Sequence, residues 1–282
     1  MNNVSSMDIK KAVHRGIVIS NREIVTDYYI MNIQIPSSFP EALPGQFVMV
    51  RTLETDTPLL SRPFSIHSQS IADKSRNIEI LYRVVGKGTK VMSHLRTGNS
   101  LSVLGPLGHG YDIQRHHRKV AIVAGGIGIA PLAYLVEYYR RGFQGGDRII
   151  AGYYGGTSER VLVGIDRLEK VCDTIKIATE DGSRGHTGVV TDLLQKDLRS
   201  FEGEGGIVCA CGPIGMMKAL AELMKERDVV CQVSMEERMA CGVGACLGCS
   251  IKAKTDANGP AFFRTCKEGP VFNIGEIDWD AH

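Results

Sequence analysis

Four cysteines near the end of the chain have the spacing of an iron-sulfur ligand set. Cys241, Cys246 and Cys249 follow a C-x4-C-x2-C pattern, and Cys266 comes after sixteen further residues. This is the spacing of the plant-type 2Fe-2S cluster, which four thiolates hold. The residues between the first three cysteines are nearly all small, so the loop can fold tightly and direct backbone amides at the sulfurs. A zinc site with the same four ligands, serving a binding protein, is the alternative.

A glycine-rich turn indicates a second kind of chemistry, the binding of a phosphate group. Gly125, Gly126 and Gly128 directly follow an apolar strand predicted over residues 120–124. Glycines let the backbone approach a phosphate, and the amides at the start of the following helix meet its charge. Pro131 suits the first turn of that helix, but it stands where the dinucleotide fingerprint has its third glycine. A tight turn without a ligand is therefore the alternative.

A third candidate site lies in the first half of the chain. Arg62 opens the segment Arg-Pro-Phe-Ser, and residues 86–89 open a short helix predicted to end at Leu95. We expect Thr89 to cap this helix, and the amides at its start could bind a pyrophosphate that Arg62 neutralises. For Arg62 alone, a surface ion pair is the alternative.

The elements that must position these residues fall into three regimes. From residue 12 to residue 107, short strands alternate with turns, which predicts a small antiparallel β-barrel or sandwich. From residue 119 to residue 232, strands and helices alternate, which predicts an α/β domain with a parallel sheet covered on both faces. The remaining residues show little periodicity, and we expect a small module held by something other than apolar burial. The predicted domains are therefore residues 1–113, 114–233 and 234–282.

The individual elements follow the same division. The strands expected in the first regime cover residues 16–21, 28–35, 45–51, 62–67, 78–85 and 100–104. The strands expected in the second regime cover residues 119–124, 147–154, 174–179 and 206–210. The helices expected between them cover residues 131–141, 164–172, 189–198 and 213–227. The glycine-rich turn thus joins the first strand of the parallel sheet to its first helix.

Composition and charge exclude several classes of protein. The 282 residues carry 33 basic and 31 acidic side chains, so the net charge of +2 gives no general attraction for nucleic acid. The apolar runs are far shorter than the roughly 20 residues of a membrane helix, and the first residues lack the features of a secretory signal. We therefore expect a cytoplasmic protein, without disulfides, that binds neither nucleic acid nor a membrane.

Taken in order, the motifs resemble those of one family. The segments RPFS, LYRVVGKGT, GPLG, GGIGIAPL and CGP and the terminal cysteines are together similar to the ferredoxin reductase superfamily. Within it, the resemblance is strongest to the electron-transfer subunits of type B dihydroorotate dehydrogenases. It covers nearly the whole chain and is most specific over residues 237–252 and 264–272. Subunits of transhydrogenase and sulfide dehydrogenase complexes look similar, but they tend to have aspartate where this chain has Cys241.

The resemblance implies a multi-domain flavoprotein with FAD on the barrel, NAD as a substrate on the parallel sheet and a 2Fe-2S cluster on the terminal module. It places along the flavin and its phosphates Arg62, Pro63, Phe64, Ser65, Leu81, Tyr82, Arg83, Gly88 and Thr89. It places Gly125, Gly126 and Gly128 against the nicotinamide dinucleotide. It places close to the nicotinamide ring Cys211, Gly212 and Pro213, although a packed thiol is the alternative for Cys211.

The resemblance also implies an electron relay in pyrimidine synthesis, with no dihydroorotate site on this chain. Electrons leave the FMN of a partner catalytic subunit, pass through the cluster to FAD and reach NAD as a hydride, and the family suggests two copies of each chain. Two other functions stay open. One is the equivalent subunit of a ferredoxin-dependent NAD(P)H transhydrogenase or a sulfide dehydrogenase complex, and the other is a zinc-stabilised binding protein.

The residues themselves leave the choice between NAD and NADP open. The loop 155–160 offers Ser158 and Arg160 to bind a 2'-phosphate, but also Glu159 to repel it. The family suggests NAD.

Several other residues have simpler explanations. We expect Cys172, Cys209 and Cys231 to be buried as small apolar residues. His116 and His117 are expected in a solvated basic linker. A few apolar residues of the tail could contact a partner, but most are expected to pack within the chain itself: Val271, Phe272, Ile274 and Trp279.

Overall fold

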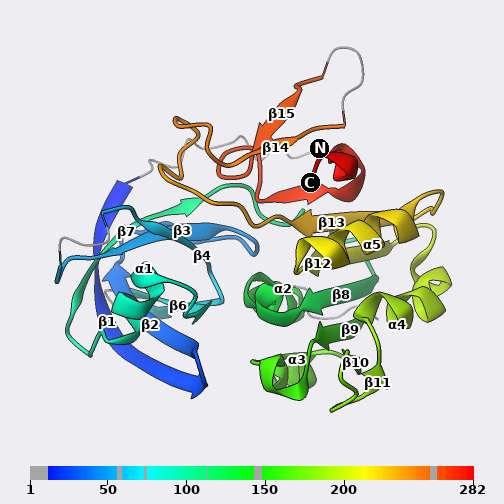
Figure 1. The fold of residues 1–282 in the computed structure, drawn as a ribbon, viewed down its shortest axis with the longest axis horizontal. Coiled ribbons are helices and arrows are strands. Elements are labelled where there is room, and N and C mark those ends of the chain that lie inside the picture. The colour runs from blue at the N-terminus through cyan, green and yellow to red at the C-terminus, as the bar shows by residue number, and fades with distance from the viewer. Residues whose placement is uncertain (1–11, 56–58, 73–74, 113, 143–147, 255–258) are drawn as a thin grey trace.

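The computed structural model describes residues 12–55, 59–72, 75–112, 114–142, 148–254 and 259–282. The chain forms two large sheets side by side, and a small module that includes the C-terminus lies across one end of both (Figure 1). Most of the helices gather around the second sheet (Figure 1).

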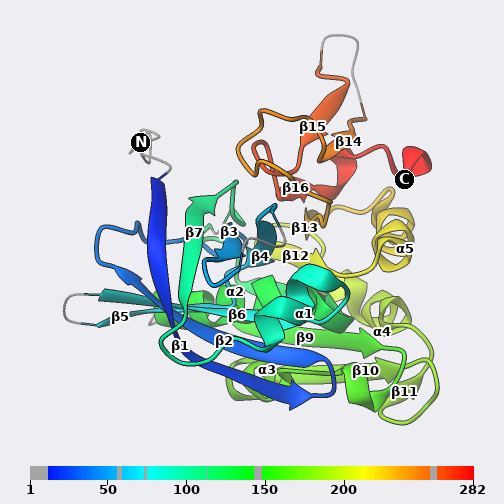
Figure 2. The same cartoon turned by 60° about the vertical axis from the view of Figure 1, so that its left-hand side comes forward.

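The first sheet has seven antiparallel strands in the order β4-β3-β7-β1-β2-β6-β5. The sheet is curved and forms a half-barrel (Figure 2), and β4 and β5 are its two edge strands. The predicted antiparallel barrel is thus confirmed in its open form, and β5 is a strand that the sequence did not reveal. The bounds are β1 (Ala12–Val25), β2 (Tyr28–Pro36), β3 (Phe47–Thr52), β4 (Arg62–Ser65), β5 (Ser68–Ala72), β6 (Ser75–Arg83) and β7 (Ser100–Leu107).

Side chains that alternate between two faces explain why this sheet forms. In β2, Met31, Ile33 and Ile35 are buried, whereas the residues between them are partly or fully exposed. This period of two is the pattern of a strand with one face on a core.

A short helix, α1 (Lys87–Ser93), follows β6. Its N-cap is Gly86 rather than Thr89, so the predicted position of the cap is wrong. The Thr89 hydroxyl instead accepts hydrogen bonds from the backbone N–H groups of Val85 (3.0 Å) and Gly86 (3.2 Å) from within the first turn. Thr89 therefore still fixes the start of the helix, because it satisfies donors that the helix leaves unpaired.

The second sheet has the order β11-β10-β9-β8-β12-β13-β16 and is parallel except for β16, which pairs antiparallel with β13. Its strands are β8 (Lys119–Gly125), β9 (Ile149–Gly156), β10 (Thr174–Thr179), β11 (His186–Thr187), β12 (Gly206–Cys211), β13 (Val230–Ser234) and β16 (Val271–Asn273). The helices are α2 (Ile129–Gly142), α3 (Ile165–Val171), α4 (Val190–Asp197) and α5 (Ile214–Met224).

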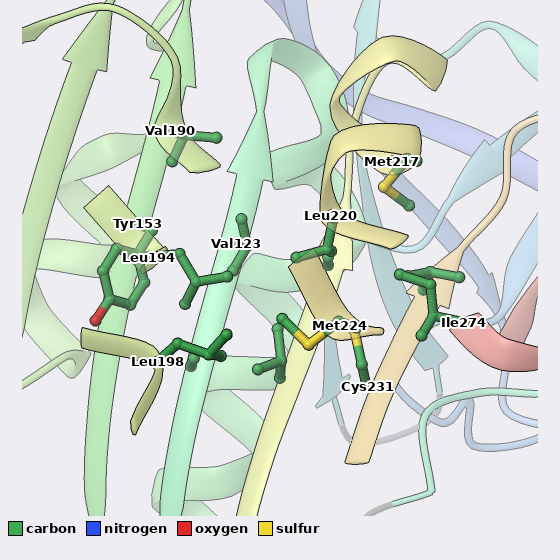
Figure 3. Packing of buried hydrophobic residues seen from close by; sticks show 14 of the residues in the cluster. Val123, Tyr153, Val190, Leu194, Leu198, Met217, Leu220, Met224, Cys231 and Ile274 are labelled. Carbon is green, nitrogen blue, oxygen red and sulfur yellow. The ribbon is translucent and has the colours of Figure 1, made fainter. Parts of the chain in front are cut away.

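Helices cover both faces of this sheet, as predicted. On one face, Val123 of β8 packs with Leu194 of α4 and with Leu220 and Met224 of α5 (Figure 3). A second buried cluster contains residues of β8, α2 and α3 and lies on the other face. Because both faces are buried, β8 and β12 are almost continuously apolar, as parallel strands usually are.

The terminal module is a hairpin, β14 (Ser250–Lys252) and β15 (Phe262–Arg264), followed by β16. Phe272 and Ile274 are buried in the same cluster as Val233 of β13. Trp279 packs against that cluster and donates from Nε1 to the Ile274 carbonyl at 2.8 Å. Apolar burial therefore contributes to holding the module, beyond what its lack of periodicity indicated, because Ile251 of β14 and Phe272 of β16 are buried in this cluster. Own-chain packing of the apolar tail is confirmed.

Two smaller expectations have different outcomes. His117 is only 4% exposed, so the solvated linker is wrong at this position. The chain there folds back onto the sheet, and Arg118 donates its backbone N–H to the Gly205 carbonyl at 2.8 Å. Burial is confirmed for Cys209 and Cys231, whereas Cys172 is half-buried. Within the described residues, no helix combines the length and the apolar character needed to cross a membrane.

Candidate functional site

One loop and one turn bring the four cysteines of the predicted cluster site together. Three of them lie in the loop between β13 and β14, and Cys266 lies in the turn after β15. Their thiols interact in two pairs, Cys241 with Cys246 and Cys249 with Cys266. No three His, Cys, Asp or Glu side chains in the described part of the chain surround one point as a single metal ion requires. Two pairs of thiols are the donor set that the two irons of a 2Fe-2S cluster use, and the residues fit it.

Backbone amides point at these sulfurs. The N–H of Gly244 donates to Cys266 Sγ at 3.1 Å, and that of Val243 donates to Cys241 Sγ at 3.4 Å. Burial raises the pKa of Cys241, but the backbone amides of Val243, Cys246 and Ala245 and the Cys246 thiol outweigh this effect and lower it to about 6. The left-handed φ angles of Gly242 (+70°) and Gly244 (+84°) allow the loop to make this turn. The small residues between the cysteines therefore do what the sequence predicted.

The cluster loop rests on the half-barrel. A Cβ added at Gly242 would lie 2.5 Å from Cγ of Met49, so loop and strand are in direct contact. Met49 is fully buried, in a cluster with Phe47, Leu107, Cys249 and Cys266. Across the sheet, Met49 of β3 pairs with Pro63 of β4. The cysteine loop thus packs against the strand pair that carries the Arg-Pro-Phe-Ser segment. Cys246, by contrast, is exposed.

An arginine and a glutamate beside Cys266 hold the loop in place. Arg264 donates from Nη1 to the Gly244 carbonyl at 3.0 Å and from Nε to Glu268 Oε2 at 3.0 Å. The arginine side chain also lowers the pKa of Glu268 to about 2. Neither residue was predicted, although both flank Cys266 in the segment on which the resemblance was strongest.

The predicted flavin residues form one group around α1 and β4. The rings of Phe64 and Tyr82 are 5.7 Å apart and stand edge to face. A Cβ at Gly88 would lie 2.7 Å from Nε of Arg62, so only glycine lets the guanidinium lie over the start of α1. Thr89 fixes the turn at this point. A cation beside exposed helix amides suits a pyrophosphate, so these residues fit the phosphate part of a flavin dinucleotide.

Other predicted flavin residues lie outside this group. Pro63 lies opposite Met49, toward the cluster loop. Ser65 is half-buried at the end of β4. Leu81 belongs to the buried cluster shared with the second sheet. The Arg83 guanidinium lies over the Tyr28 ring, 5.5 Å from its centroid, and lines a different cavity.

That cavity, of about 610 Å³, lies between the two sheets. It contains the predicted nucleotide residues Gly125, Gly126, Gly128, Gly212 and Pro213. The two turns touch, because a Cβ at Gly128 would lie 2.1 Å from the Cys211 carbonyl oxygen. The two glycine turns therefore form a surface of bare backbone at the carboxyl ends of the parallel strands. Ligands bind at this edge in such sheets, and the surface fits a dinucleotide.

Cys211 forms part of the wall behind this surface of bare backbone. It is 1% exposed, and its Sγ lies 4.0 Å from Glu236 Oε1. Burial, and then the Glu236 charge, raise the pKa of the Cys211 thiol well above its ordinary value. The thiol is therefore neutral and is not an activated nucleophile.

Sequence reasoning missed several residues of the cavity. Thr157 and Glu180 follow β9 and β10, and the rule that ligands bind beyond the carboxyl ends of parallel strands could have found them. Burial raises the pKa of Glu236, which lines the cavity from the segment that leads into the cluster loop. Tyr28 comes from the half-barrel, and no sequence signal marked it.

The loop expected to choose between NAD and NADP has a different arrangement. Of its residues, Gly155, Gly156 and Thr157 line the cavity, but the three residues weighed for a 2'-phosphate do not. Glu159 pairs instead with Arg184, with 3.6 Å between Oε1 and Nη1. The carboxylate at the cavity on this side is that of Glu180.

Three family models match the chain in succession. An oxidoreductase FAD-binding domain matches residues 15–111, and an oxidoreductase NAD-binding domain matches residues 122–222. The iron-sulfur cluster binding domain of dihydroorotate dehydrogenase B matches residues 236–278. The chain thus contains an FAD-binding, an NAD-binding and an iron-sulfur domain, as predicted, and the zinc alternative is not supported.

Known proteins match nearly the whole chain. It is 40% identical over 248 residues to the electron transfer subunit of dihydroorotate dehydrogenase B (NAD(+)) of Clostridium acetobutylicum, covering 88% of this chain and 91% of that one. The protein of the same name from Desulforamulus reducens is 37% identical over 258 residues, covering 91% and 95%. The solved structure of an NADH-dependent reduced ferredoxin-NADP oxidoreductase has a TM-score of 0.79 at 28% identity, covering 94% and 90%. The chain belongs to the family of electron transfer subunits of NAD-dependent dihydroorotate dehydrogenase B.

Proposed function

We propose that this chain conveys electrons from the FMN of a partner dihydroorotate dehydrogenase subunit, through a 2Fe-2S cluster and FAD, to NAD in pyrimidine synthesis. The observation that carries this is the central position of the half-barrel. On one side it contacts the cysteine loop through Met49 and Gly242, and on the other it lines the nucleotide cavity with Tyr28 and Arg83. Such an order of sites suits a relay in series.

The residues of the half-barrel have binding and orienting roles in this proposal. Arg62, Gly88 and Thr89 hold the flavin pyrophosphate. The rings of Phe64 and Tyr82 lie against the flavin, beside Pro63, Ser65 and Leu81. When bound, the cluster supplies single-electron transfer, and FAD exchanges single electrons with it and a hydride with NAD. Hydride transfer needs position and exclusion of water more than an acid or a base, which agrees with the neutral Cys211 thiol.

In the nucleotide cavity, the three glycines of the turn and Gly212 with Pro213 seat the dinucleotide. The neutral side chain of Cys211 is proposed to pack beside the nicotinamide ring and to help position it. Arg83 faces the same cavity from the half-barrel, so it can contact both dinucleotides.

The face that carries Cys246 is proposed to meet the partner. Cys246 is exposed, and Leu247 beside it is 62% exposed with a left-handed φ of +59°. An exposed ligand lets an electron enter from another protein, and an apolar neighbour suits a contact. We further propose two copies of each chain in the complex, the domain division at residues 113 and 233, and a location in the cytoplasm.

One observation favours a second function. The structural match at a TM-score of 0.79 is to an oxidoreductase of ferredoxin and NADP that performs electron bifurcation. This chain could therefore serve a transhydrogenase or a sulfide dehydrogenase complex. The cysteine at position 241 argues against these, because their relatives tend to carry aspartate there.

The test is the reaction of the assembled complex. The chain and an FMN-containing dihydroorotate dehydrogenase subunit are expected to co-purify and to reduce NAD with dihydroorotate only when both are present. Cys246→Ser is expected to abolish this reaction but to leave NADH reduction of the flavin, whereas Cys172→Ser leaves both unchanged. Reduction of NADP by reduced ferredoxin, with no response to dihydroorotate, would favour the second function. A purified chain without iron and sulfide contradicts both.

A further inference from the structure

Helix α2 begins at the nucleotide-binding turn and then runs along the half-barrel. Three of its residues, Ala130, Tyr134 and Glu137, are spaced four and three apart and therefore lie on one face of the helix. All three contact the half-barrel. The Tyr134 hydroxyl donates to the Ala42 carbonyl at 2.8 Å, and Glu137 Oε2 accepts from Ser68 Oγ at 3.4 Å. The turn that seats the nicotinamide dinucleotide is thus tied to the flavin domain through this helix.

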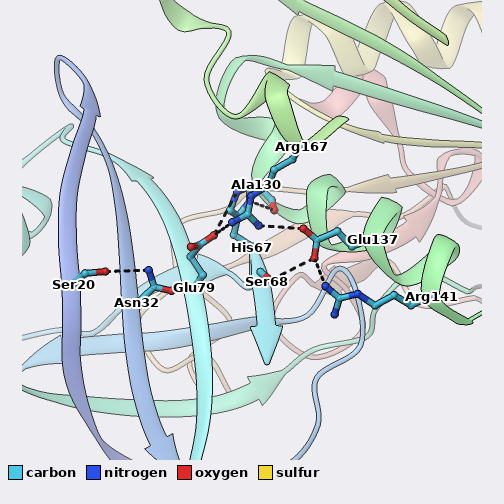
Figure 4. A network of polar contacts seen from close by, with 9 residues as sticks. All are labelled: Ser20, Asn32, His67, Ser68, Glu79, Ala130, Glu137, Arg141 and Arg167. Carbon is cyan, nitrogen blue, oxygen red and sulfur yellow. Dashed lines mark hydrogen bonds and ion pairs between the residues drawn. The ribbon is translucent and has the colours of Figure 1, made fainter. Parts of the chain in front are cut away.

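The innermost of these contacts involves a buried histidine. His67 is fully buried, and its Nδ1 lies 2.9 Å from the Ala130 carbonyl oxygen (Figure 4). A carbonyl can only accept, so Nδ1 carries the proton and donates. His67 follows the flavin strand β4 by two residues, and Ala130 follows Gly128 by two residues. One hydrogen bond therefore joins the segment that follows β4 to the start of α2, directly after the nucleotide turn.

An ion-pair network surrounds this histidine. Arg167 of α3 pairs with Glu79 of β6 and, at 3.4 Å, with Glu137 of α2, as Figure 4 shows. All three side chains are less than 25% exposed. Nε2 of His67 lies 4.0 Å from Glu79 Oε1. The guanidinium of Arg167 thus bridges a carboxylate of the half-barrel, Glu79, and one of α2, Glu137. We call these three side chains beside His67 the cage.

We propose that His67 is a positioning residue for hydride transfer: its bond to Ala130, within the cage of Arg167, Glu79 and Glu137, sets the nucleotide turn in register with the flavin strand. This rests on the proposed function, in which the reduced flavin gives a hydride, two electrons and one proton, to NAD⁺; the test below follows the same transfer in reverse, from NADH to the oxidised flavin. Such a transfer is sensitive to distance, since a shift of 1 Å can cost about a hundredfold in rate. Both domains line the cavity, so a small change in their register changes that distance.

The test compares two replacements of His67 in the full chain with its flavin and cluster. His67→Leu removes the donor, whereas the side-chain amide of His67→Asn can still donate to Ala130. NADH is mixed with each protein without oxygen, and the rate of flavin reduction and the long-wavelength charge-transfer absorbance are recorded. We expect His67→Leu to reduce flavin about tenfold more slowly and with a weaker charge-transfer band, while the Kd for NADH changes less than about twofold. His67→Asn is expected to recover most of both signals.

A matched pair of arginines keeps the test decisive if His67→Leu does not fold. Arg167→Lys keeps the charge but cannot bridge two carboxylates in the same way. Arg140 pairs with Asp173 at 2.6 Å, so Arg140→Lys makes the same change within the nucleotide domain. Slower flavin reduction and a weaker band in Arg167→Lys alone support the proposal.

Several outcomes overturn it. These are a folded, flavin-loaded His67→Leu with the rate and the band of the unaltered protein, an Asn variant as slow as the Leu variant, and equal behaviour of the two lysine variants. The measurement uses NADH and no partner, so loss of dihydroorotate activity counts against the proposed function only. Flavin absorbance before mixing shows separately whether FAD is bound.

Discussion

The cluster loop takes its ligands from residues 241–266 and the hydrogen bonds that hold it from the same stretch, whereas the nucleotide cavity draws on segments from Tyr28 to Glu236. In the loop, an amide of Gly244 meets a cysteine 22 residues away, and Arg264 closes the turn. In the cavity, two glycine turns meet only because β8 and β12 are neighbours in the sheet. Local spacing therefore specifies the first site, and topology specifies the second.

This difference predicts two kinds of response to substitution. A cluster needs all of its ligands, so losing one removes the site. The cavity spreads its contacts over several segments, so single changes there should have graded effects. The exception is a position where two segments touch through their backbones.

The largest expected effect is at a buried cysteine ligand. Cys249 is 1% exposed and pairs with Cys266, so Cys249→Ser is expected to lose nearly all iron and sulfide. Because metal binding contributes folding energy, the terminal module is also expected to unfold more easily. Iron and sulfide analysis and visible circular dichroism measure the loss. The control is Cys172→Ser, because Cys172 is half-buried and lies far in the sequence from the four cysteines of the cluster loop. Full iron content in Cys249→Ser would show that the loop is not the ligand set.

The next largest effect is expected where the two glycine turns touch. A Cβ at Gly128 would lie 2.1 Å from a backbone oxygen, which cannot move like a flexible side chain. Gly128→Ala is therefore expected to lower the free energy of unfolding by about 3 kcal/mol and to weaken NADH binding strongly. Gly142→Ala, at the far end of α2 with its nearest neighbour at 3.8 Å, is expected to leave both unchanged. Denaturant unfolding and fluorescence titration measure the two quantities, and equal behaviour of the variants contradicts the contact.

The same contrast explains how much could be predicted from the sequence. Local patterns could be predicted from the sequence, and these include the four cysteines, the glycine turn and the alternation of strands and helices. The side chains of Tyr28 and Glu180 were not, because only the folded sheets bring them to the cavity. The apolar strand β16 was missed for a physical reason: three residues are too few to show a period, yet they complete the edge of a sheet.

The domain junction is a second example of information absent from the sequence. His67 was expected at the end of a strand, and Ala130 in the turn just before a helix. Their hydrogen bond depends on how two domains dock, which no spacing within either one reveals.

Stability at acid pH tests this junction. Burial, and then the Arg167 charge, lower the pKa of His67 to about 4, while Asp166 and the Ala130 carbonyl oppose the shift. The unfolded chain, with an ordinary histidine, therefore binds a proton before the folded chain does. The contribution of His67 to the free energy of unfolding is fully present above about pH 6.5. It is lost as the pH falls toward 4, and the loss is roughly 2 kcal/mol at pH 5. Glu79, which also faces His67, adds its own carboxylate titration in both proteins compared below.

The comparison is between the unaltered chain and His67→Asn, which does not titrate. Denaturant unfolding at pH 7 and at pH 5 is expected to show a larger loss for the unaltered chain. An equal loss in both proteins would mean that His67 is accessible to protons and that the two domains separate more readily than the contacts indicate.

The smallest expected effect concerns the choice of nucleotide. Glu180 lines the cavity after β10, and the cation that lines the cavity, among the described residues, is Arg83 on the half-barrel side. A carboxylate at this end repels a 2'-phosphate, so Glu180→Gln is expected to raise kcat/KM for NADPH relative to NADH by about tenfold, or about 1.4 kcal/mol. Glu159→Gln is the matched control, because Glu159 pairs with Arg184 and does not line the cavity. If Glu159→Gln changed the ratio of kcat/KM for NADPH and NADH more than Glu180→Gln, the loop after β9 would determine the selectivity, as the sequence alone suggested. A local sequence pattern would then specify this part of the cavity, as it specifies the cluster loop.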